Sequence, residues 1–213
     1  MMNKSQKFWD KQAKKYDYNE RQFEPVYKEI ISKTKEHLNT NDNVLDFGCA
    51  TGTKTLELAR ATKQIQGIDI SNEMIKEATK KTKDLKITNA SFIHGTIFTN
   101  VFNEESFDEI ISYGVIHLLD DSKNIIRRIH ELLKPDGLFI SSTACLKDKM
   151  ALKNKLEFSA YLFIKKLGIF PLHINMFRTS DVEKLIVSQG FDLVKAEKIF
   201  HGITISFIVA RKR

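Results

Sequence analysis

A short stretch with two glycines and a carboxylate, Val44 to Thr53, constrains the fold of this chain more than any other part of the sequence. It starts as an apolar strand and ends as the beginning of a helix. Gly48 and Gly52 can take backbone conformations that other residues avoid, and they let a ligand approach the main chain. Asp46 places a negative charge at that contact. The stretch therefore predicts a ligand-binding turn between a first strand and a helix.

Apolar strands and amphipathic helices alternate along the rest of the chain. Strands are expected at 44–47, 64–70, 90–94, 107–113 and 138–143, helices at 23–38, 53–62, 72–83, 122–133 and 179–189, and a β-hairpin at 191–200 and 203–211. Lys134 to Gly137 is expected to form a turn between a helix and a strand. Alternation of this kind predicts an α/β fold with a parallel sheet and helices on both faces.

Length and composition indicate one globular domain spanning residues 1–213. The chain is 42% hydrophobic, which is enough to bury a sizeable core. Its polar first ten residues are not typical of a signal peptide, and it has no apolar run of about 18 residues. Two distant cysteines suit a reducing compartment, so the cytoplasm is the expected location. Residues 1–40 are expected to form an N-terminal helical cap segment.

Four residues are expected to converge on one crevice, because ligands in such sheets bind at the carboxyl ends of strands. Asp46, Asp69, Gly95 and Tyr113 all lie at or just after a strand end. A pyrophosphate-binding loop would need the spacing G-x-G-x-x-G, whereas alanine stands at the middle glycine position here. Asp46 would repel a pyrophosphate but attract an ammonium or sulfonium group. Asp69, 21 positions after Gly48, can accept both hydroxyls of a ribose.

Four motifs give the chain a family resemblance. They are Val-Leu-Asp-Phe-Gly-Cys-Ala-Thr-Gly at 44–52, Gly-Ile-Asp-Ile-Ser at 67–71, Phe-Asp-Glu-Ile-Ile-Ser-Tyr-Gly-Val-Ile-His-Leu-Leu-Asp at 107–120 and Leu-Lys-Pro-Asp-Gly-Leu-Phe at 133–139. In this order they resemble class I S-adenosylmethionine-dependent methyltransferases of the small-molecule kind, such as the quinone-biosynthesis and "type 11" enzymes. The resemblance implies a Rossmann-like, doubly wound sheet of seven strands, mostly parallel with an antiparallel C-terminal hairpin.

The resemblance also implies a set of residues that bind S-adenosylmethionine. Gly48 to Ala50 would contact its methionine part, Asp69 the ribose, and Tyr113 to Val115 the methyl-transfer face. Relatives commonly carry aspartate where Thr96 stands, so adenine selectivity is expected to be weaker or to come from backbone groups. The residues implied in cofactor binding are Tyr16, Asp46, Gly48, Cys49, Ala50, Gly52, Asp69, Ile70, Met74, Gly95, Thr96, Ile97, Tyr113 and Gly114.

Two residues near the fourth expected strand are candidate catalytic groups. His117 can take a proton near neutral pH if the acceptor begins protonated. The simpler explanation is a structural histidine at the head of a loop. Tyr113 could orient an acceptor oxygen, although it could equally pack against the cofactor or the core. The histidines are scattered without the spacing of a zinc site, so no metal is expected.

Residues 147–178 interrupt the alternation and are expected to form an inserted helical substrate lid. The segment is basic, with Lys147, Lys149, Lys153, Lys155, Lys165, Lys166 and Arg178 against Asp148 and Glu157. Aromatic residues are mixed with these charges. Packing of this lid over the site is the preferred explanation, and peripheral contact with a membrane surface is the alternative.

The expected function is methyl transfer to a small-molecule acceptor, lipid-like or aromatic. A net charge of +7 would also suit a nucleic-acid partner, but the fourth strand lacks the Asn/Asp-Pro-Pro-aromatic motif of base-amine methyltransferases. A nucleic-acid partner is therefore not expected. The alternatives are an RNA or protein methyltransferase and a non-catalytic protein that senses the cofactor. An NAD-dependent oxidoreductase fits least. The sequence does not indicate the acceptor's attacking atom or the oligomeric state.

Overall fold

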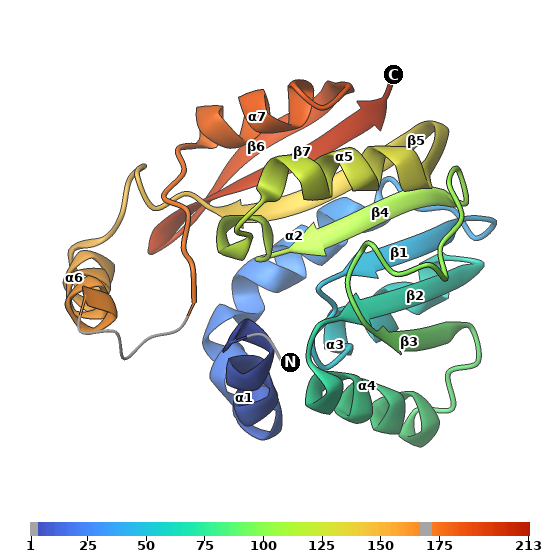
Figure 1. Cartoon of the computed structure of the whole chain (residues 1–213), viewed down its shortest axis with the longest axis horizontal. Helices are drawn as coiled ribbons and strands as arrows, with labels where there is room; N and C mark the ends of the chain where they lie inside the picture. The colour runs from blue at the N-terminus through green and yellow to red at the C-terminus, as the bar shows by residue number, and fades with distance from the viewer. Residues whose placement is uncertain (1–3, 167–171) are drawn as a thin grey trace.

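The structure is a computed structural model that describes residues 4–166 and 172–213. Seven strands alternate with helices along the chain (Figure 1). The strands are β1 (Asn43–Phe47), β2 (Gln64–Asp69), β3 (Ala90–His94), β4 (Phe107–Tyr113), β5 (Leu133–Ala144), β6 (Phe191–His201) and β7 (Ile203–Lys212). The α-helices are α1 (Lys4–Glu20), α2 (Glu24–Lys35), α3 (Thr53–Leu58), α4 (Asn72–Asp84), α5 (Ser122–Leu132), α6 (Leu152–Lys166) and α7 (Thr179–Val187). Short 3₁₀ helices are η1 (Arg21–Phe23), η2 (Ala59–Ala61) and η3 (Ile116–Leu118).

The strands form one sheet in the order β3-β2-β1-β4-β5-β7-β6. All pairs from β3 to β5 are parallel, and β7 runs antiparallel to both of its neighbours, β5 and β6. The predicted seven-stranded sheet with an antiparallel C-terminal hairpin is therefore confirmed. The order reverses at β1, which places the binding edge at the carboxyl ends of β1, β2 and β4.

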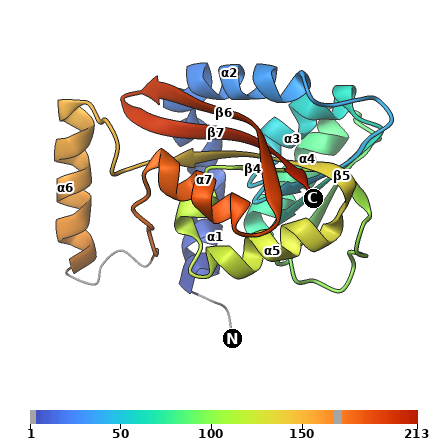
Figure 2. The same ribbon diagram turned by 90° about the horizontal axis from the view of Figure 1, so that it is seen from above.

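Helices cover both faces of the sheet, because successive side chains of a strand point to opposite sides. Leu45 and Ile110 pack with apolar residues of α5 and α7, whereas their neighbours Val44 and Ile111 pack with those of α2 and α3. Figure 2 shows α2 on one side of the strands and α5 and α7 on the other. The two clusters make the core and leave the ends of the strands free for a site.

Side-chain caps set the starts of two helices at the binding edge. Ser71 Oγ accepts a hydrogen bond from the backbone N–H of Met74, and Asp121 Oδ1 accepts one from that of Asn124. Each satisfies an amide that the first helical turn leaves unpaired. The loops after β2 and β4 are thereby held in place.

Lys134 to Gly137 were predicted to form a turn between a helix and a strand, and this prediction was wrong. The four residues belong to β5, which begins directly after α5. Phe107 pairs with Leu133 and Glu109 pairs with Leu138. Between these two pairs, β5 therefore contains three more residues than β4. The extra residues bulge out of the strand, and Asp136 takes a positive φ of 64°. A bulge accommodates Pro and Gly without ending the pairing.

Helix α1 packs against α4, near the carboxyl ends of the strands, and α6 projects away from the body of the molecule beyond the end of β5 (Figure 1). In the described part of the chain, no helix is long and apolar enough to cross a bilayer.

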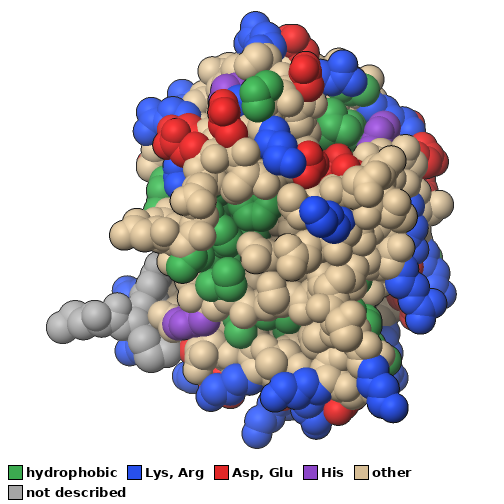
Figure 3. Space-filling view, turned by 90° about the vertical axis from the view of Figure 1, so that its right-hand side faces the viewer, with side chains coloured by type: hydrophobic (Ala, Val, Ile, Leu, Met, Phe, Trp, Pro, Cys, Tyr) green, Lys and Arg blue, Asp and Glu red, His purple; other side chains and the backbone are tan. Residues whose placement is uncertain are grey.

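Figure 3 views the side away from α6, where Lys and Arg side chains gather along the lower margin. This is the level of α4, which exposes Lys76, Lys80 and Lys83. On this face, positive charge therefore lies mainly at the margin.

Candidate functional site

The turn after β1 folds back over the end of β2. The backbone N–H groups of Gly48 and Cys49 both donate to the carbonyl of Ile68, at 2.8 and 3.2 Å. Gly48 has a φ of 78°, and a Cβ added to it would lie 2.4 Å from Val115 Cγ2. The turn therefore needs glycine at this position for both its backbone conformation and its clearance.

Asp69, at the end of β2, accepts two backbone hydrogen bonds. Its Oδ2 binds the N–H of Ala50 at 3.0 Å, and its Oδ1 binds that of Ser71 at 2.8 Å. Burial raises the pKa of this carboxyl, and the two backbone hydrogen bonds oppose that change. A carboxylate offers about four acceptor sites, so capacity remains for two further donors. A vicinal diol of a ribose has the donors that this position can take.

Asp46 lies beneath the turn and not at its surface. Its side chain is 2% exposed, and its Oδ2 accepts a hydrogen bond from Thr55 Oγ1 at 2.5 Å. Burial raises its pKa to about 6. Asp46 does not line the cavity described below, and its contact with a ligand stays a prediction. The hydrogen bond to Thr55 ties Asp46 to α3, the helix that follows the turn.

Helix α1 is fastened across the open end of the site by two aspartates. Asp10 Oδ1 accepts from Ser71 Oγ at 2.7 Å, at the start of α4. Asp17 Oδ1 accepts from Thr51 Oγ1 at 2.6 Å, and its Oδ2 pairs with Lys81 Nζ at 2.6 Å. These aspartates are seven residues apart, on one face of the helix. Helix α1 therefore crosses the turn, whereas the role of residues 1–40 as a cap segment stays a prediction.

A cavity of about 350 Å³ opens between the turn, the ends of β2 and β4, and α1. Trp9, Phe47, Leu118, Leu119, Ile125 and Leu172 contribute much of its apolar wall. Of the residues predicted to bind a cofactor, those that line it are Tyr16, Gly48, Ala50, Asp69, Ile70, Met74, Gly95, Tyr113 and Gly114. The structure thus brings most of the predicted set together.

Four other predicted residues do not line this cavity. Ile97 is 1% exposed and belongs to the core, and Thr96 points outward on the loop after β3. Gly52 and Cys49 lie behind the turn, where Gly52 begins α3 and Cys49 is buried. Contact with a cofactor at these four positions stays a prediction, since the motif gives their order along the chain but not the side on which each residue faces.

Sequence reasoning missed Trp9 and Leu172 as lining residues. Trp9 lies seven residues before Tyr16, which places both on one face of α1, and their rings are 6.2 Å apart at 74°. That spacing could have identified Trp9. Leu172 lies on an irregular segment, so no periodicity could have indicated it.

A second cavity of about 390 Å³ adjoins the first. The two share wall residues from α1, the end of β4 and the segment after α6: Trp9, Tyr16, Tyr113, Gly114, Leu118 and Leu172. The second cavity continues between α2 and the ends of β5 and β7, where Ala144, Ile203 and Ile205 line it. Two ligands bound in these cavities would meet at the end of β4.

His117 lines the second cavity from η3. Its Nδ1 is buried and has no hydrogen-bond partner among the described residues. Burial lowers its pKa to about 4, so the imidazole is neutral at pH 7. Its backbone carbonyl accepts the N–H of Asn175 at 2.7 Å, which fixes its position.

The hydroxyl of Tyr113 does not face either cavity. It donates to Thr34 Oγ1 at 2.7 Å, and that hydroxyl in turn donates to the carbonyl of Ile30. All three groups lie in the core under α2. This arrangement favours the alternative that Tyr113 packs in the core, because its phenol already makes a buried hydrogen bond, and its role in orienting an acceptor oxygen stays a prediction.

We expect His117 to make stability depend on pH. Its pKa is near 6.5 in an unfolded chain and about 4 in the fold, so between these values the unfolded state binds more protons. Its contribution is therefore complete above pH 6.5 and is lost as the pH falls towards 4. From pH 7 to pH 5, the free energy of unfolding should fall by about 2 kcal/mol more in the wild type than in His117→Gln. Urea unfolding at both pH values measures this, and equal losses would contradict it.

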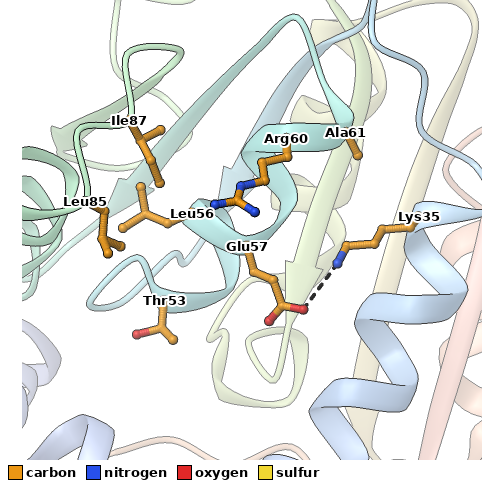
Figure 4. Close-up of a pocket in the computed structure, with 8 residues that line it drawn as sticks. All are labelled: Lys35, Thr53, Leu56, Glu57, Arg60, Ala61, Leu85 and Ile87. Carbon is orange, nitrogen blue, oxygen red and sulfur yellow. Dashed lines mark hydrogen bonds and ion pairs between the residues drawn. The ribbon is translucent and has the colours of Figure 1, made fainter.

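Another hollow, about 570 Å³, lies on the flank of α3 (Figure 4). It is lined by Leu56, Leu85 and Ile87, and Lys35 Nζ pairs with Glu57 Oε1 at 3.2 Å at its edge. No predicted site residue lines it, so it carries no argument for function. Among residues 4–166 and 172–213, no group of three His, Cys, Asp or Glu side chains could hold a metal ion.

Comparisons with known proteins agree with this geometry. Residues 38–167 match a family model described as "Methyltransferase domain". The chain is 32% identical over 152 residues to an uncharacterized methyltransferase of Oceanobacillus iheyensis, covering 69% of this chain and 68% of that one. It is 37% identical over 155 residues to an uncharacterized protein of Methanocaldococcus jannaschii, covering 70% of this chain and 56% of that one. The solved structure of the YcgJ protein from Bacillus subtilis superposes with a TM-score of 0.70 at 16% identity, covering 87% of this chain and 98% of that one.

Proposed function

Because the chain belongs to the family of class I S-adenosylmethionine-dependent methyltransferases, we propose that it methylates a small molecule with an apolar body. The observation that carries the proposal is the pair of adjoining cavities at the end of β4. One has the groups that the cofactor needs. The other is mostly apolar, and it contains a neutral histidine.

The residues of the first cavity fit S-adenosylmethionine. Its volume of about 350 Å³ lies in the usual range for a small-ligand site. Asp69 would accept the ribose hydroxyls, and Ile70 and Met74 would pack against the adenine. The clearance at Gly48 would let the methionine part approach the backbone. When bound, the cofactor supplies an electrophilic methyl group on a sulfonium.

This chain's own residues would align the acceptor and exclude water. Displacement at a methyl carbon needs the attacking atom in line with the carbon–sulfur bond, so positioning is the main demand. Trp9 and Tyr16 on α1 line both cavities and would close them from solvent. His117 Nδ1 would take the proton from an acceptor that begins protonated.

The lining of the second cavity supports a small acceptor that is largely uncharged. Among the described lining residues, Glu20 is the one carboxylate, and it already pairs with Lys54 Nζ at 3.0 Å. Lys54 lies over the Tyr27 ring at 3.8 Å and is not a lining residue. A strongly charged acceptor would be left without a counter-charge there, which is costly against a mostly apolar wall.

His117→Gln is expected to lower kcat about 10- to 100-fold while cofactor affinity changes less than about twofold. The reason is that His117 lines the second cavity and not the first. Steady-state kinetics with the identified acceptor and calorimetry with S-adenosylmethionine measure the two quantities. A parallel loss of both would show that His117 only supports the fold.

The proposal is tested by incubating the protein and host extract with S-adenosylmethionine labelled in the methyl group. The extract is separated into small-molecule, lipid, RNA and protein fractions, with Gly48→Ala protein as the background control. Label in the small-molecule or lipid fraction supports the proposal. Label confined to RNA or protein contradicts it, and tight cofactor binding with no label in any fraction identifies a sensor.

A further inference from the structure

Helix α6 stands away from the body of the protein (Figures 1 and 2). It begins beside the tip of the β6–β7 hairpin, where the N–H of Ala151 donates to the carbonyl of Gly202 at 2.7 Å. The N–H of Thr204 donates to the carbonyl of Lys149 at 3.1 Å. Among the described residues, α6 has no extensive packing against another helix or strand. The helix is thus fixed at its first turn and projects beyond it. None of its described side chains lines either cavity, whereas Leu172 and Ile174, later in the segment 147–178, line one or both.

The two sides of α6 differ in exposure. Ala151, Asn154, Phe158 and Tyr161 are half-buried and recur every three or four residues, so they form one face. The opposite face carries Leu152, Leu156 and Phe163, which are 74, 65 and 65% exposed. These three are four and seven residues apart, which places them in one stripe along the helix. We call them the α6 stripe.

Lysines lie to both sides of the α6 stripe. Lys153 is 86% exposed and Lys155 is exposed as well, and they flank the stripe on a helical projection. At the base of the helix, Lys149 Nζ lies 5.0 Å above the ring of Phe200, which is half exposed on the hairpin tip. Of the nearby carboxylates, Asp148 is held inward by the N–H of Thr179, and Glu157 is 3.8 Å from Lys153.

From this arrangement we infer that the α6 stripe and its lysines dock the protein on a membrane surface with anionic headgroups. A helix with an exposed apolar stripe between lysines lies in the bilayer interface, where the stripe enters the acyl boundary and the lysines meet the phosphates. A nucleic acid would use the lysines but would leave the leucines and the phenylalanine in water. The charge and the apolar stripe together therefore favour lipid.

The docked position would bring the second cavity close to the bilayer. Met150, just before α6, pairs with Ile203, and Ile203 lines that cavity. An apolar acceptor could then pass from the membrane to the site over a short distance. This last step rests on the proposed function, whereas the docking itself does not.

The experiment is flotation of the full chain with vesicles of neutral phosphatidylcholine, or of phosphatidylcholine with about 30% phosphatidylglycerol, in the absence of cofactor and acceptor. We expect the wild type to float with the anionic vesicles. The double variant Leu156→Gln and Phe163→Gln should lose at least 10-fold in partitioning. Lys153→Gln with Lys155→Gln should also lose several-fold. The matched controls are Leu85→Gln, 62% exposed at the C-terminal cap of α4, and Lys80→Gln with Lys83→Gln on that helix.

The outcomes separate the explanations. Losses confined to the α6 variants, with controls unchanged and thermal unfolding unaltered, support the inference. No binding of the wild type, or equal losses in the α4 controls, overturns it. Loss with the lysine pair but not with the apolar pair also overturns it, since it would indicate a purely electrostatic surface of the kind that binds nucleic acid. Because no methyl transfer is measured, failure here leaves the proposed function standing.

Discussion

Gly48→Ala is expected to reduce the affinity for S-adenosylmethionine by more than about 100-fold and to lower the free energy of unfolding by about 1 to 3 kcal/mol. The added Cβ would lie 2.4 Å from Val115 Cγ2, in a backbone conformation with a φ of 78°. Val115 is β-branched and packs against the core, so it cannot easily move away. Calorimetric titration and urea unfolding measure the two effects.

The control for Gly48→Ala is Gly190→Ala at the end of α7. Gly190 has a φ of 93°, and its Cβ would meet His130 Nε2 at 2.9 Å, far from both cavities. This variant should lose comparable stability and keep cofactor affinity. If both variants lose affinity equally, the effect arises from general destabilisation and the turn is not the binding site.

Asp69→Ala is expected to reduce cofactor affinity by at least about 100-fold. The observed rate of methyl transfer should fall at low cofactor concentration and recover when the cofactor is saturating. Two hydrogen bonds from ribose hydroxyls to a buried carboxylate would be lost. The backbone N–H groups of Ala50 and Ser71 would also lose their acceptor. Asp69→Asn keeps the shape and one acceptor oxygen, so it should show a smaller loss of affinity. Calorimetry at constant pH measures both variants.

Asp84→Ala removes a carboxylate of the same type from the exposed end of α4 and serves as the control for charge. It should leave cofactor affinity unchanged. An Asp69→Ala protein that folds and binds the cofactor as the wild type does would place the ribose elsewhere.

Much of the fold follows from local patterns in the sequence. The alternation of strands and helices, the glycine turn after β1 and the C-terminal hairpin are all short-range features, and the sheet order confirms them. The register between β4 and β5 could not be predicted in the same way. Lys134 to Gly137 reads as a turn locally, but pairing of Leu133 with Phe107 extends the strand through it. Pairing with a distant strand outweighs local turn preference there.

In the candidate site, too, some features could be predicted from the sequence and others could not. Residues at strand ends, such as Asp69 and Gly114, were predictable because the topology places them on one edge. The direction of each side chain was not. Asp46 turns beneath the loop to Thr55, and Tyr113 turns to Thr34, because each has a buried hydrogen-bond partner that comes from a distant element or the next helix. A motif gives position along the chain, and packing decides which atoms reach the ligand.

For the α6 segment, composition alone could not decide between two functions. Its basic and aromatic residues left a substrate lid and a membrane contact as alternatives. The exposure of Leu152, Leu156 and Phe163, and the absence of α6 from the walls of both cavities, could be learned only from the fold.

The central claim is that the cavity between Gly48 and Asp69 holds S-adenosylmethionine. Calorimetric titration of the wild-type chain with S-adenosylmethionine, and in parallel with NAD, tests it most directly. We predict binding of one S-adenosylmethionine per chain in the micromolar range, on the order of −8 kcal/mol, and no measurable heat with NAD. Binding of NAD without binding of S-adenosylmethionine would contradict the claim.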